Sequence, residues 1–450
     1  MRILFRAILL VMLPVITSCK KDAPLIYDVG TNEYINTWIL DSMRRYYFWS
    51  ENLPADPNLN IEPNGFFETI RNETDRFSRL YLPNDPSSFE TSSRSAFGFE
   101  YAVIEQPKER SVLGVVKLVL KDSPAERAGL KRGDLIKSIN GKAFTTENAN
   151  SLYQALINSQ TLNLTTQIFV SGETAEQEIE IQKGWTFEQP LVSRIYTLNT
   201  GKVGYVYIDH FSFGLSTSLQ PVFKQFKNEH INALILDLRY NLGGEVSEAA
   251  GVSALIAPDI DFRTAFITYK GNKNGGTRDE TFGEAATFDG YIYFDELLHA
   301  KLNLPNVYVL TTRSTASAAE VVINCLKPYM EVITIGEKTM GKDLASFLIK
   351  DGAFPQQVAW EIQPIVYKLY NSAGSGDYGK GLSPTLTVNE LDELPLFEIG
   401  DDRDLLIKAA LNQVQKTNDK VYRTKTSSHA VVRFDSQSSR ASQSVILTHK

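Results

Sequence analysis

Short apolar runs alternate with helical patterns through the second half of the chain. Residues Ile231–Leu238, Asn306–Thr312 and Glu331–Glu337 are rich in aliphatic and β-branched side chains, which is typical of buried parallel strands. Residues 245–256 and Ser317–Leu326 carry the apolar spacing of helices that pack on a sheet. This alternation predicts an α/β core of parallel strands joined by crossover helices.

Further helices are predicted on both sides of this core. Thr31–Trp49 places apolar side chains at helical spacing and Asn64–Asn72 fits a second helix, so we expect a small N-terminal helical cap. Asp401–Gln415 fits a closing helix. Beyond residue 422 the chain is rich in Ser, Thr and Gln, and we expect a mobile tail.

Composition narrows the class of function. The chain has 450 residues, a net charge of −7 and no run rich in Lys or Arg, which argues against nucleic acid as a partner. The five histidines show no metal-like spacing, and no phosphate or dinucleotide motif is visible, so we expect neither a metal nor a cofactor. Cys325 falls on an apolar helix and fits a small core residue.

Ser317 and Lys342 are the candidate nucleophile and base of a catalytic site. Ser317 begins a helix among small side chains, where a substrate backbone can approach and free N–H groups favour an oxyanion. Lys342 follows a strand that returns to the same end of the sheet. A lysine activates serine only when neutral, so its pKa must fall from about 10.4 to about 7–8, which costs about 4 kcal/mol. The alternative is an ordinary helix cap and a solvated lysine.

Two glycines could complete such a site. Gly243 and Gly244 lie at a strand-to-helix turn, and their N–H groups could form an oxyanion hole together with that of Ala318. The alternative is a tight turn without a ligand. His210 follows the strand Val203–Ile208, so a Ser–His pair remains a rival to the Ser–Lys pair.

Three ordered motifs accompany these residues. They comprise Asp237, Leu238, Arg239, Asn241, Gly243 and Gly244; Thr315, Ser317 and Glu320; and Gly336, Glu337, Thr339, Gly341 and Lys342, with Gly379–Pro384 as a closing segment. From about residue 75 to about residue 412 the chain resembles the carboxyl-terminal processing, or tail-specific, peptidases. That family consists of serine–lysine peptidases with a crotonase-like core and a PDZ domain.

The chain departs from the family pattern beside the lysine. The family often has a glutamine four residues after the lysine, where this chain has Ser346, and an acidic residue eleven positions after the nucleophile, where it has Pro328. We expect Ser346 to support the amine of Lys342, with Gln356 or Gln357 as substitutes for the missing glutamine.

A second module precedes the core. Ser123–Ala125, Ala128–Leu130, Gly133–Asp134 and Ile139–Gly141 resemble a PDZ domain, which binds an extended peptide by strand addition. By this resemblance Phe97, Gly98 and Phe99 would bind the peptide carboxylate, and the helix Asn148–Ile157 would form the other wall of the groove. The alternative is a degenerate PDZ fold that serves only for packing.

The first nineteen residues predict export. Positive charge at Arg2 and Arg6 precedes a short apolar stretch, Ala7–Ile16, as in a signal peptide. Ile16–Cys19 resembles a bacterial lipobox, so Cys19 would be acylated and anchor the protein to a lipid bilayer in the cell envelope. The alternative is plain secretion with cleavage near Cys19.

Together these observations predict an envelope-anchored serine endopeptidase that captures proteins or peptides by accessible C-termini. The rival hypotheses are an inactive PDZ-containing peptide-binding lipoprotein and a hydrolase of a non-peptide acyl group. We expect a signal peptide at 1–19, a tether and helical cap at 20–91, a PDZ domain at 92–186, a peptidase core at 187–421 and a mobile tail at 422–450.

Overall fold

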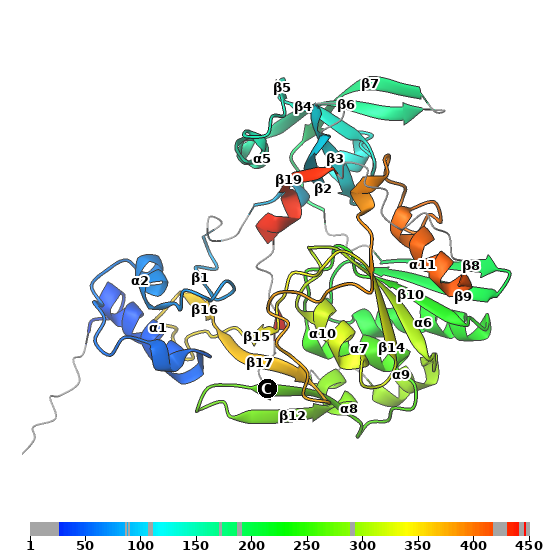
Figure 1. The fold of residues 1–450 in the computed structure, drawn as a ribbon. Coiled ribbons are helices and arrows are strands. Elements are labelled where there is room, and N and C mark those ends of the chain that lie inside the picture. Colours follow the sequence, from blue (N-terminus) through cyan, green and yellow to red (C-terminus); the bar gives the residue numbers. More distant parts are fainter. Residues whose placement is uncertain are drawn as a thin grey trace, which may run out of the picture.

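The computed structural model describes residues 27–85, 88, 91–106, 111–170, 173–186, 191–288, 293–416, 430–440 and 445–446. Figure 1 shows a helical N-terminal part, an α/β part and a β-rich part above it. Within the described ranges no helix is long and apolar enough to cross a membrane. The predicted signal peptide and Cys19 lie outside these ranges, so lipidation stays a prediction.

The α/β part is built on a six-stranded sheet with the strand order β18-β14-β13-β10-β9-β8. The strands from β18 to β9 pair in parallel, and β8 pairs antiparallel with β9 at one edge. The strands are β8 (Leu191–Leu198), β9 (Gly201–Ile208), β10 (Ala233–Asp237), β13 (Asn306–Thr311), β14 (Glu331–Gly336) and β18 (Leu386–Thr387). This confirms the predicted α/β core of parallel strands.

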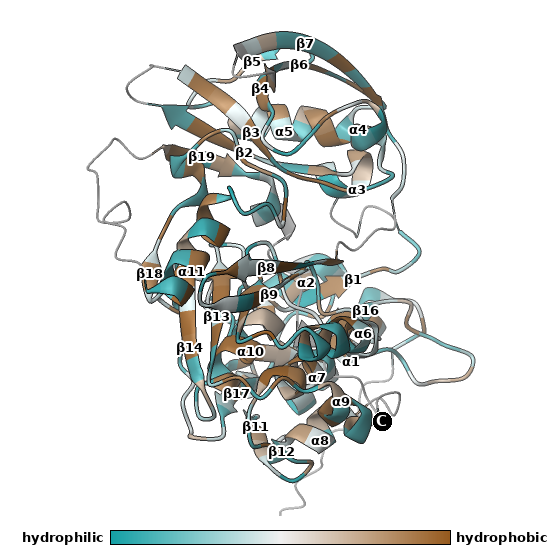
Figure 2. Ribbon diagram, turned by 90° about the vertical axis from the view of Figure 1, so that its right-hand side faces the viewer, coloured by the Kyte–Doolittle hydropathy of each residue, from teal (hydrophilic) through white to brown (hydrophobic). Residues whose placement is uncertain are grey.

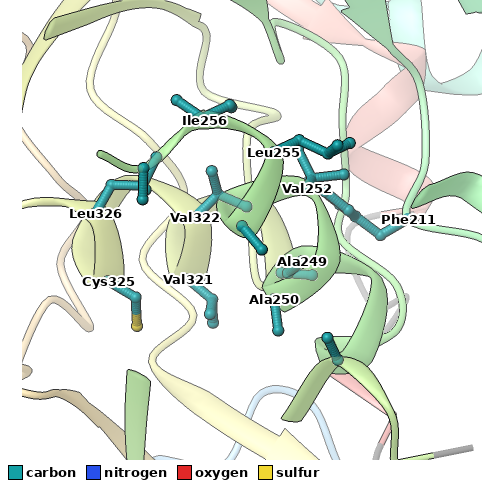
Figure 3. Packing of buried hydrophobic residues seen from close by; sticks show 14 of the residues in the cluster. Phe211, Ala249, Ala250, Val252, Leu255, Ile256, Val321, Val322, Cys325 and Leu326 are labelled. Atoms are coloured by element: carbon teal, nitrogen blue, oxygen red, sulfur yellow. The ribbon is translucent and has the colours of Figure 1, made fainter. Parts of the chain in front are cut away.

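Helices cover both faces of this sheet. Successive side chains of a strand point to opposite faces, and here both sets are apolar, so each face is buried against helices. Leu234 and Leu236 belong to a core cluster with one group of helices, whereas Ala233 and Ile235 belong to a cluster with α11 (Leu405–Gln415). The first group comprises α6 (Leu215–Asn228), α7 (Val246–Ile256), α8 (Phe282–Ala286), α9 (Phe294–Ala300) and α10 (Ala318–Leu326). Figure 3 shows α7 and α10 packed through small and aliphatic side chains, with Cys325 among them as predicted.

A second sheet has the order β12-β11-β17-β15-β20. Its strands pair antiparallel, except that β20 pairs in parallel with β15. The strands are β11 (Ala265–Lys270), β12 (Thr277–Thr281), β15 (Leu344–Ser346), β17 (Ile365–Asn371) and β20 (Val445–Ile446). Lys342 therefore lies in the segment that joins β14 of the main sheet to β15 of this second sheet.

The N-terminal part contains α1 (Asn32–Tyr46) and α2 (Pro63–Ile70), which share a core cluster. The short strand β1 (Arg79–Tyr81) pairs antiparallel with β16 (Glu361–Gln363), beside the second sheet. Asn272 lies in the loop between β11 and β12, and its Nδ2 donates to the carbonyl oxygen of Tyr47 at 2.9 Å. This bond anchors the C-terminal end of α1 on the α/β part.

The β-rich part has the strand order β19-β2-β3-β4-β6-β7, with β5 paired to β4. Its elements are α3 (Ser93–Phe97), β2 (Phe99–Gln106), β3 (Ser111–Val119), α4 (Pro124–Arg127), β4 (Leu135–Ile139), β5 (Lys142–Ala143), α5 (Ala149–Asn158), β6 (Thr161–Val170), β7 (Glu173–Gln182) and β19 (Val431–Asp435). Figure 2 shows this part above the main sheet, with α11 beside β18.

The C-terminal segment departs from the expectation of a mobile tail. Val431–Asp435 forms β19 in the sheet of the β-rich part, Ser436–Arg440 forms a 3-10 helix, and Val445–Ile446 forms β20 in the second sheet. Polar composition suggested mobility, but hydrogen bonding to two sheet edges fixes these residues. Figure 1 shows the red segment beside β2.

A buried charge network joins the β-rich part to the α/β part. Arg132 donates to Tyr240 Oη at 2.6 Å and lies 3.2 Å from carboxylate oxygens of Glu390 and Asp404. Arg239 donates to both oxygens of Asp404, at 2.8 and 2.9 Å. These side chains are nearly or fully buried, so the two parts share a polar core.

Candidate active site

Ser317 is the N-cap residue of α10 and has an unusual backbone. Its φ of 62° and ψ of −120° lie in a region that non-glycine residues rarely occupy, at a cost on the order of 1–3 kcal/mol. Its side chain has no solvent exposure. Such a conformation persists only where the surrounding structure holds it, and such residues are frequent at functional sites.

Two turns are bonded to each other around Ser317. Thr315 Oγ1 donates to the carbonyl oxygen of Leu238 at 2.8 Å, and the Ala316 N–H donates to that of Asn241 at 2.9 Å. Asn241 Nδ2 in turn donates to the carbonyl oxygen of Ile208 at 3.0 Å. The first motif therefore ties the end of β10, the end of β9 and the start of α10 together.

Gly243 lies directly against Ser317. It has a φ of +110°, and a Cβ added there would meet Ser317 Cβ at 2.6 Å and Ser317 Oγ at 3.0 Å. The same added Cβ would lie 3.1 Å from the nitrogen of Ala318. Only glycine fits this close approach, so the sequence signal of two glycines marks the contact with Ser317.

The three N–H groups expected in the oxyanion hole differ in their availability. The Gly243 N–H donates to Asn241 Oδ1 at 2.8 Å, so it is already committed within the turn. For Gly244 and Ala318 the described residues provide no acceptor, and the Ala318 N–H begins the helix next to Ser317. Within that part of the chain the N–H groups of Ala318 and Gly244 are therefore uncommitted, whereas that of Gly243 is not.

Glu320 holds the serine and lysine turns together. Its Oε2 accepts the N–H groups of Ser317 at 2.9 Å and Lys342 at 2.8 Å, and its Oε1 accepts the N–H of Gly341 at 2.8 Å. Thr339 Oγ1 also donates to Oε1. Because one carboxylate oxygen binds the backbone of both Ser317 and Lys342, these two residues are neighbours in space.

The predicted closing segment supports the lysine turn from outside. Gly341 has a φ of +86°, and a Cβ there would lie 2.3 Å from the nitrogen of Gly381. The Leu382 N–H donates to Thr339 Oγ1 at 2.7 Å, and the Thr339 N–H donates back to the carbonyl oxygen of Leu382 at 3.1 Å. Gly379–Pro384 therefore packs against the third motif.

Lys342 is fully buried, and burial lowers its pKa to about 7. The positive charge of Arg79 lowers the pKa further, whereas Asp75 and Glu320 oppose this effect. Lys342 Nζ lies 4.5 Å from the centre of the Phe77 ring. The segment before β1 thus covers the amine of Lys342. Arg76 in this segment donates to the carbonyl oxygen of Gly341 at 2.9 Å and so holds the segment against the lysine turn.

The serine hydroxyl and the lysine amine are not hydrogen bonded in this state. Among the described residues Ser317 Oγ is buried and has no hydrogen-bond partner, which excludes such a bond to Lys342 and to His210. His210 precedes Phe211, whose backbone bridges to Gly244, so it too borders the turn that faces Ser317. Catalytic hydrogen bonds are often unformed in unliganded enzymes and form when substrate binds.

Gln363 supplies a side-chain amide that the sequence did not suggest for this site. Its Nε2 donates to Ser346 Oγ at 3.2 Å, and both side chains are buried. Gln363 pairs with Arg79 across β1 and β16, so it lies next to the segment that covers the amine of Lys342.

The glutamines suggested as substitutes do not support the lysine. Gln356 and Gln357 are exposed and bond to Val358 and Tyr34, so neither occupies the position of the missing glutamine. Pro328 is exposed beyond the end of α10.

The residues expected to bind a peptide carboxylate form the junction between α3 and β2. Phe97 ends α3, and the Gly98 N–H donates to the carbonyl oxygens of Ser93 and Arg94, at 3.1 and 2.9 Å. Gly98 has a φ of +86°, and an added Cβ would lie 2.1 Å from Ser123 Cβ. The side chains of Phe97 and Phe99 are buried in the core of this part. The Gly98 N–H is thus engaged by the end of the helix.

These residues offer a hydroxyl, an amine of lowered pKa and uncommitted N–H groups on turns that are hydrogen bonded to one another. Such a set suits the attack of serine on a carbonyl group. Among the described residues no group of three His, Cys, Asp or Glu side chains could hold a metal ion. The sequence suggested Ser317 and Lys342 as site residues, but it did not suggest Phe77 and Gln363, which come from distant segments.

The fold joins an α/β peptidase domain to a PDZ domain, as comparisons with protein families show. The peptidase family S41 matches residues 202–388, the peptidase S41 N-terminal domain matches residues 34–79, and the PDZ domain matches residues 115–167. The chain belongs to peptidase family S41, with the N-terminal domain of that family and a PDZ domain.

Several known proteins are similar to this chain. A probable CtpA-like serine protease of Staphylococcus aureus is 24% identical over 296 residues, which cover 63% of this chain and 53% of that protein. A carboxyl-terminal-processing protease of Synechocystis is 26% identical over 284 residues, which cover 62% and 61%. The chain thus spans between half and two thirds of the length of these relatives.

A solved structure agrees with the fold. The crystal structure of a Bacteroides fragilis protein assigned to the S41 proteases is 28% identical. It matches with a TM-score of 0.68 and covers 85% of this chain and 98% of that chain. Because the match covers most of both chains, the N-terminal part, the PDZ domain and the α/β part occur together in that protein as well.

Proposed function

We propose that the protein is a serine endopeptidase in which Ser317 is the nucleophile and Lys342 is the general base. The observation that carries this proposal is the buried Lys342 amine with a pKa of about 7, on a turn that shares a carboxylate oxygen with Ser317. A base with this pKa is neutral in half of the molecules at pH 7. Membership of peptidase family S41 supports a peptide as the substrate.

The proposed reaction passes through an acyl-enzyme. Ser317 Oγ attacks the scissile carbonyl carbon while Lys342 Nζ takes the hydroxyl proton, and the N–H groups of Ala318 and Gly244 hold the oxyanion. The C–N bond then breaks, and Lys342 returns the proton to the leaving amine. Water hydrolyses the ester in the same way and regenerates Ser317. Loss of one oxyanion donor typically costs about 10²–10³ in rate.

Ser346 and Gln363 are proposed as positioning residues for the amine. Ser346 lies on β15, which begins two residues after Lys342, and it receives a hydrogen bond from Gln363. A hydroxyl that accepts from Gln363 keeps its own hydrogen for another acceptor, such as a neutral amine. This pair would take the place of the glutamine that the family pattern leads one to expect four residues after the lysine.

The first test is replacement of the nucleophile. Ser317→Ala is expected to abolish cleavage of an unfolded protein substrate, with a decrease of at least about 10³-fold in kcat/KM. Cleavage is followed by gel electrophoresis, and folding is checked by the far-ultraviolet circular dichroism spectrum. Ser218→Ala, an exposed serine on α6, serves as the matched control and is expected to leave activity unchanged. Substantial turnover by Ser317→Ala would exclude the assigned nucleophile.

The rival function is a peptide-binding protein without hydrolysis. The unformed bond between Ser317 and Lys342 and the complete burial of both side chains favour it. Labelling by a serine-reactive fluorophosphonate separates the two functions, because only an activated hydroxyl reacts at an appreciable rate. Absence of labelling at Ser317 even in the presence of a bound C-terminal peptide would establish the binding function instead.

We also propose that the protein is exported and anchored in the bacterial cell envelope through acylated Cys19. The apolar stretch Ala7–Ile16 and the sequence Ile16–Cys19 support this proposal. The substrates would then be envelope proteins with accessible C-termini. Cys19→Ala is expected to move the protein from the membrane fraction to the soluble fraction, and unchanged membrane association would contradict the anchor.

A further inference from the structure

The peptide groove of the PDZ domain contains a segment of this same chain. β19 is the edge strand of the PDZ sheet and pairs antiparallel with β2, with Val431 opposite Glu105 and Asp435 opposite Ala102. The segment therefore runs toward the start of β2, which is the end near Gly98. PDZ domains bind extended peptides by adding a strand in this manner.

The side chain of Phe434 lies between the two walls of the groove. Its ring centre is 4.9 Å from that of Tyr153 on α5 and 5.9 Å from that of Tyr101 on β2. Tyr153 and Tyr101 belong to the buried core of the domain, and Phe434 packs against that core. The segment thus inserts an aromatic anchor, which is a common feature of tightly bound peptides.

The groove also binds an acidic group directly after the aromatic residue. Lys117 is almost fully buried, and its Nζ donates to Asp435 Oδ2 at 2.8 Å and to Gln437 Oε1 at 2.9 Å. The same Nζ lies 4.7 Å from the ring centre of Tyr240, in the motif that leads to Gly243. Without this segment Lys117 would lose two hydrogen-bond partners, so an acidic group on another peptide would be favoured in their place.

One residue of the segment reaches the turn that carries Ser317. Gln437 is fully buried, and its Oε1 accepts a hydrogen bond from Ser314 Oγ at 2.8 Å. Its Nε2 donates to Glu100 of β2. Gln437 therefore connects the PDZ strand to the loop three residues before Ser317, and Ser317 itself is closed to solvent in this state.

Further along, the chain approaches the lysine side of the site. β20 pairs in parallel with β15, with Val445 opposite Ala345 and Ile446 opposite Ser346. β15 begins two residues after Lys342. The C-terminal region thus adds a strand first to the PDZ domain and then to the sheet beside the candidate site.

We propose that residues 430–440 are an internal ligand of the PDZ domain that competes with substrate tails and holds the peptidase in a closed resting state. The groove accordingly selects an extended peptide with an aromatic side chain followed by a carboxylate, from a side chain or from a C-terminus. This inference rests on the proposed function for the part that concerns the peptidase, whereas the binding of the segment stands on its contacts alone.

The test is a binding measurement in the Ser317→Ala background, so that no catalysis is needed. The probe is a fluorescein-labelled peptide with the sequence of residues 430–438, AVVRFDSQS, and binding is followed by fluorescence anisotropy. A segment that occupies the groove nine tenths of the time weakens peptide binding about tenfold. We therefore expect at least about tenfold tighter binding to the Phe434→Ala full-length chain and to a chain that ends at residue 429.

Controls separate this result from general loosening of the fold. Phe354→Ala removes a fully exposed phenylalanine and is expected to bind the peptide as weakly as the parent chain does. A peptide with Phe434→Ala is expected not to bind to any of these chains. If truncation prevents folding, the full-length Phe434→Ala chain carries the test. Equal peptide affinity in the parent and Phe434→Ala chains, or no binding to either, would overturn the proposal.

In the chain with an intact Ser317, Phe434→Ala is expected to raise kcat/KM for an unfolded protein several-fold. An unchanged kcat/KM would overturn the resting-state part of the inference. Inactivity of every variant would count against the proposed function, while the binding result would still decide whether the segment is an internal ligand.

Discussion

At the scale of single residues, the candidate site depends on the uncharged state of one amine. Burial lowers the pKa of Lys342 to about 7, and the ring of Phe77 lies against its Nζ. Leu344 and Phe347 are the apolar residues that lie close to the lysine along the chain. The residue that actually covers the amine is more than 260 positions away in the sequence, so only the folded arrangement reveals it.

The lowered pKa predicts a pH-dependent cost to stability. The unfolded chain holds the Lys342 proton up to about pH 10.4 and the folded chain only up to about pH 7, so folding releases a proton between these values. The wild-type protein therefore gains stability as pH rises through this window. Lys342→Met removes the penalty, which is about 5 kcal/mol below pH 7 and vanishes above about pH 10.

Urea unfolding of both proteins at pH 6, 8 and 9.5 measures this difference. The stabilisation by Lys342→Met is expected to be largest at pH 6 and to decrease steadily at higher pH. Lys408, which is exposed on α11, provides the control, since Lys408→Met is expected to show no such trend. A stabilisation that is independent of pH would show that the amine is charged in the folded protein.

At the scale of elements, the start of α10 is bonded to both the serine turn and the lysine turn of the site. Glu320 is the third residue of this helix, and its carboxylate accepts N–H groups from the serine turn and from the lysine turn. The sequence predicted the helix and matched Glu320 to a motif. It could not show that one side chain binds both turns, because hydrogen bonds between distant loops leave no periodic signal.

Glu320→Gln should loosen this arrangement. An amide side chain keeps one acceptor oxygen and presents an NH₂ group to N–H donors, so at least one backbone bond to Ser317, Gly341 or Lys342 is lost. We expect a loss of about 1–3 kcal/mol in stability and at least about a tenfold decrease in kcat.

The matched control is Glu284→Gln. Glu284 is the third residue of α8 and accepts the N–H of Thr281 at 2.9 Å, so the substitution makes the same chemical change at the same helix position outside the site. Steady-state kinetics and thermal unfolding of both variants compare the effects. Equal effects on kcat in the two variants would contradict the role given to Glu320.

At the scale of the whole molecule, the separate domains could be predicted from the sequence, but the contacts between them could not. Apolar runs at strand and helix spacing predicted the α/β core, and the resemblance of short motifs to those of a PDZ domain implied the second fold. The composition of residues 422–450 suggested mobility, whereas Phe434 and Gln437 are held by the PDZ domain. One phenylalanine in a polar tail is too weak a signal to predict strand addition to a distant domain.

Arg132 is expected to couple the two domains. Arg132→Met removes the bonds from the PDZ domain to Tyr240, Glu390 and Asp404 and leaves buried carboxylates with fewer partners. The cost is about 3–5 kcal/mol, as for other broken buried ion pairs. Arg127→Met, at an exposed position of α4, is expected to change stability by less than about 0.5 kcal/mol.

Differential scanning calorimetry distinguishes loss of coupling from a local effect. The parent chain is expected to unfold with the PDZ domain and the peptidase domain in one transition, and Arg132→Met in two. A single transition at an unchanged temperature in Arg132→Met would show that the buried network does not join the domains.

The central claim is that a neutral Lys342 activates Ser317, and the pH dependence of Ser317 labelling by a fluorophosphonate tests it most directly. Mass spectrometry of the labelled peptide gives the rate between pH 5.5 and 9. The rate is predicted to rise about tenfold per pH unit, to be half-maximal near pH 7 and to become constant above it. In Lys342→Ala it should be at least about 10²-fold slower and flat. A rate that is the same with and without the lysine would contradict the account.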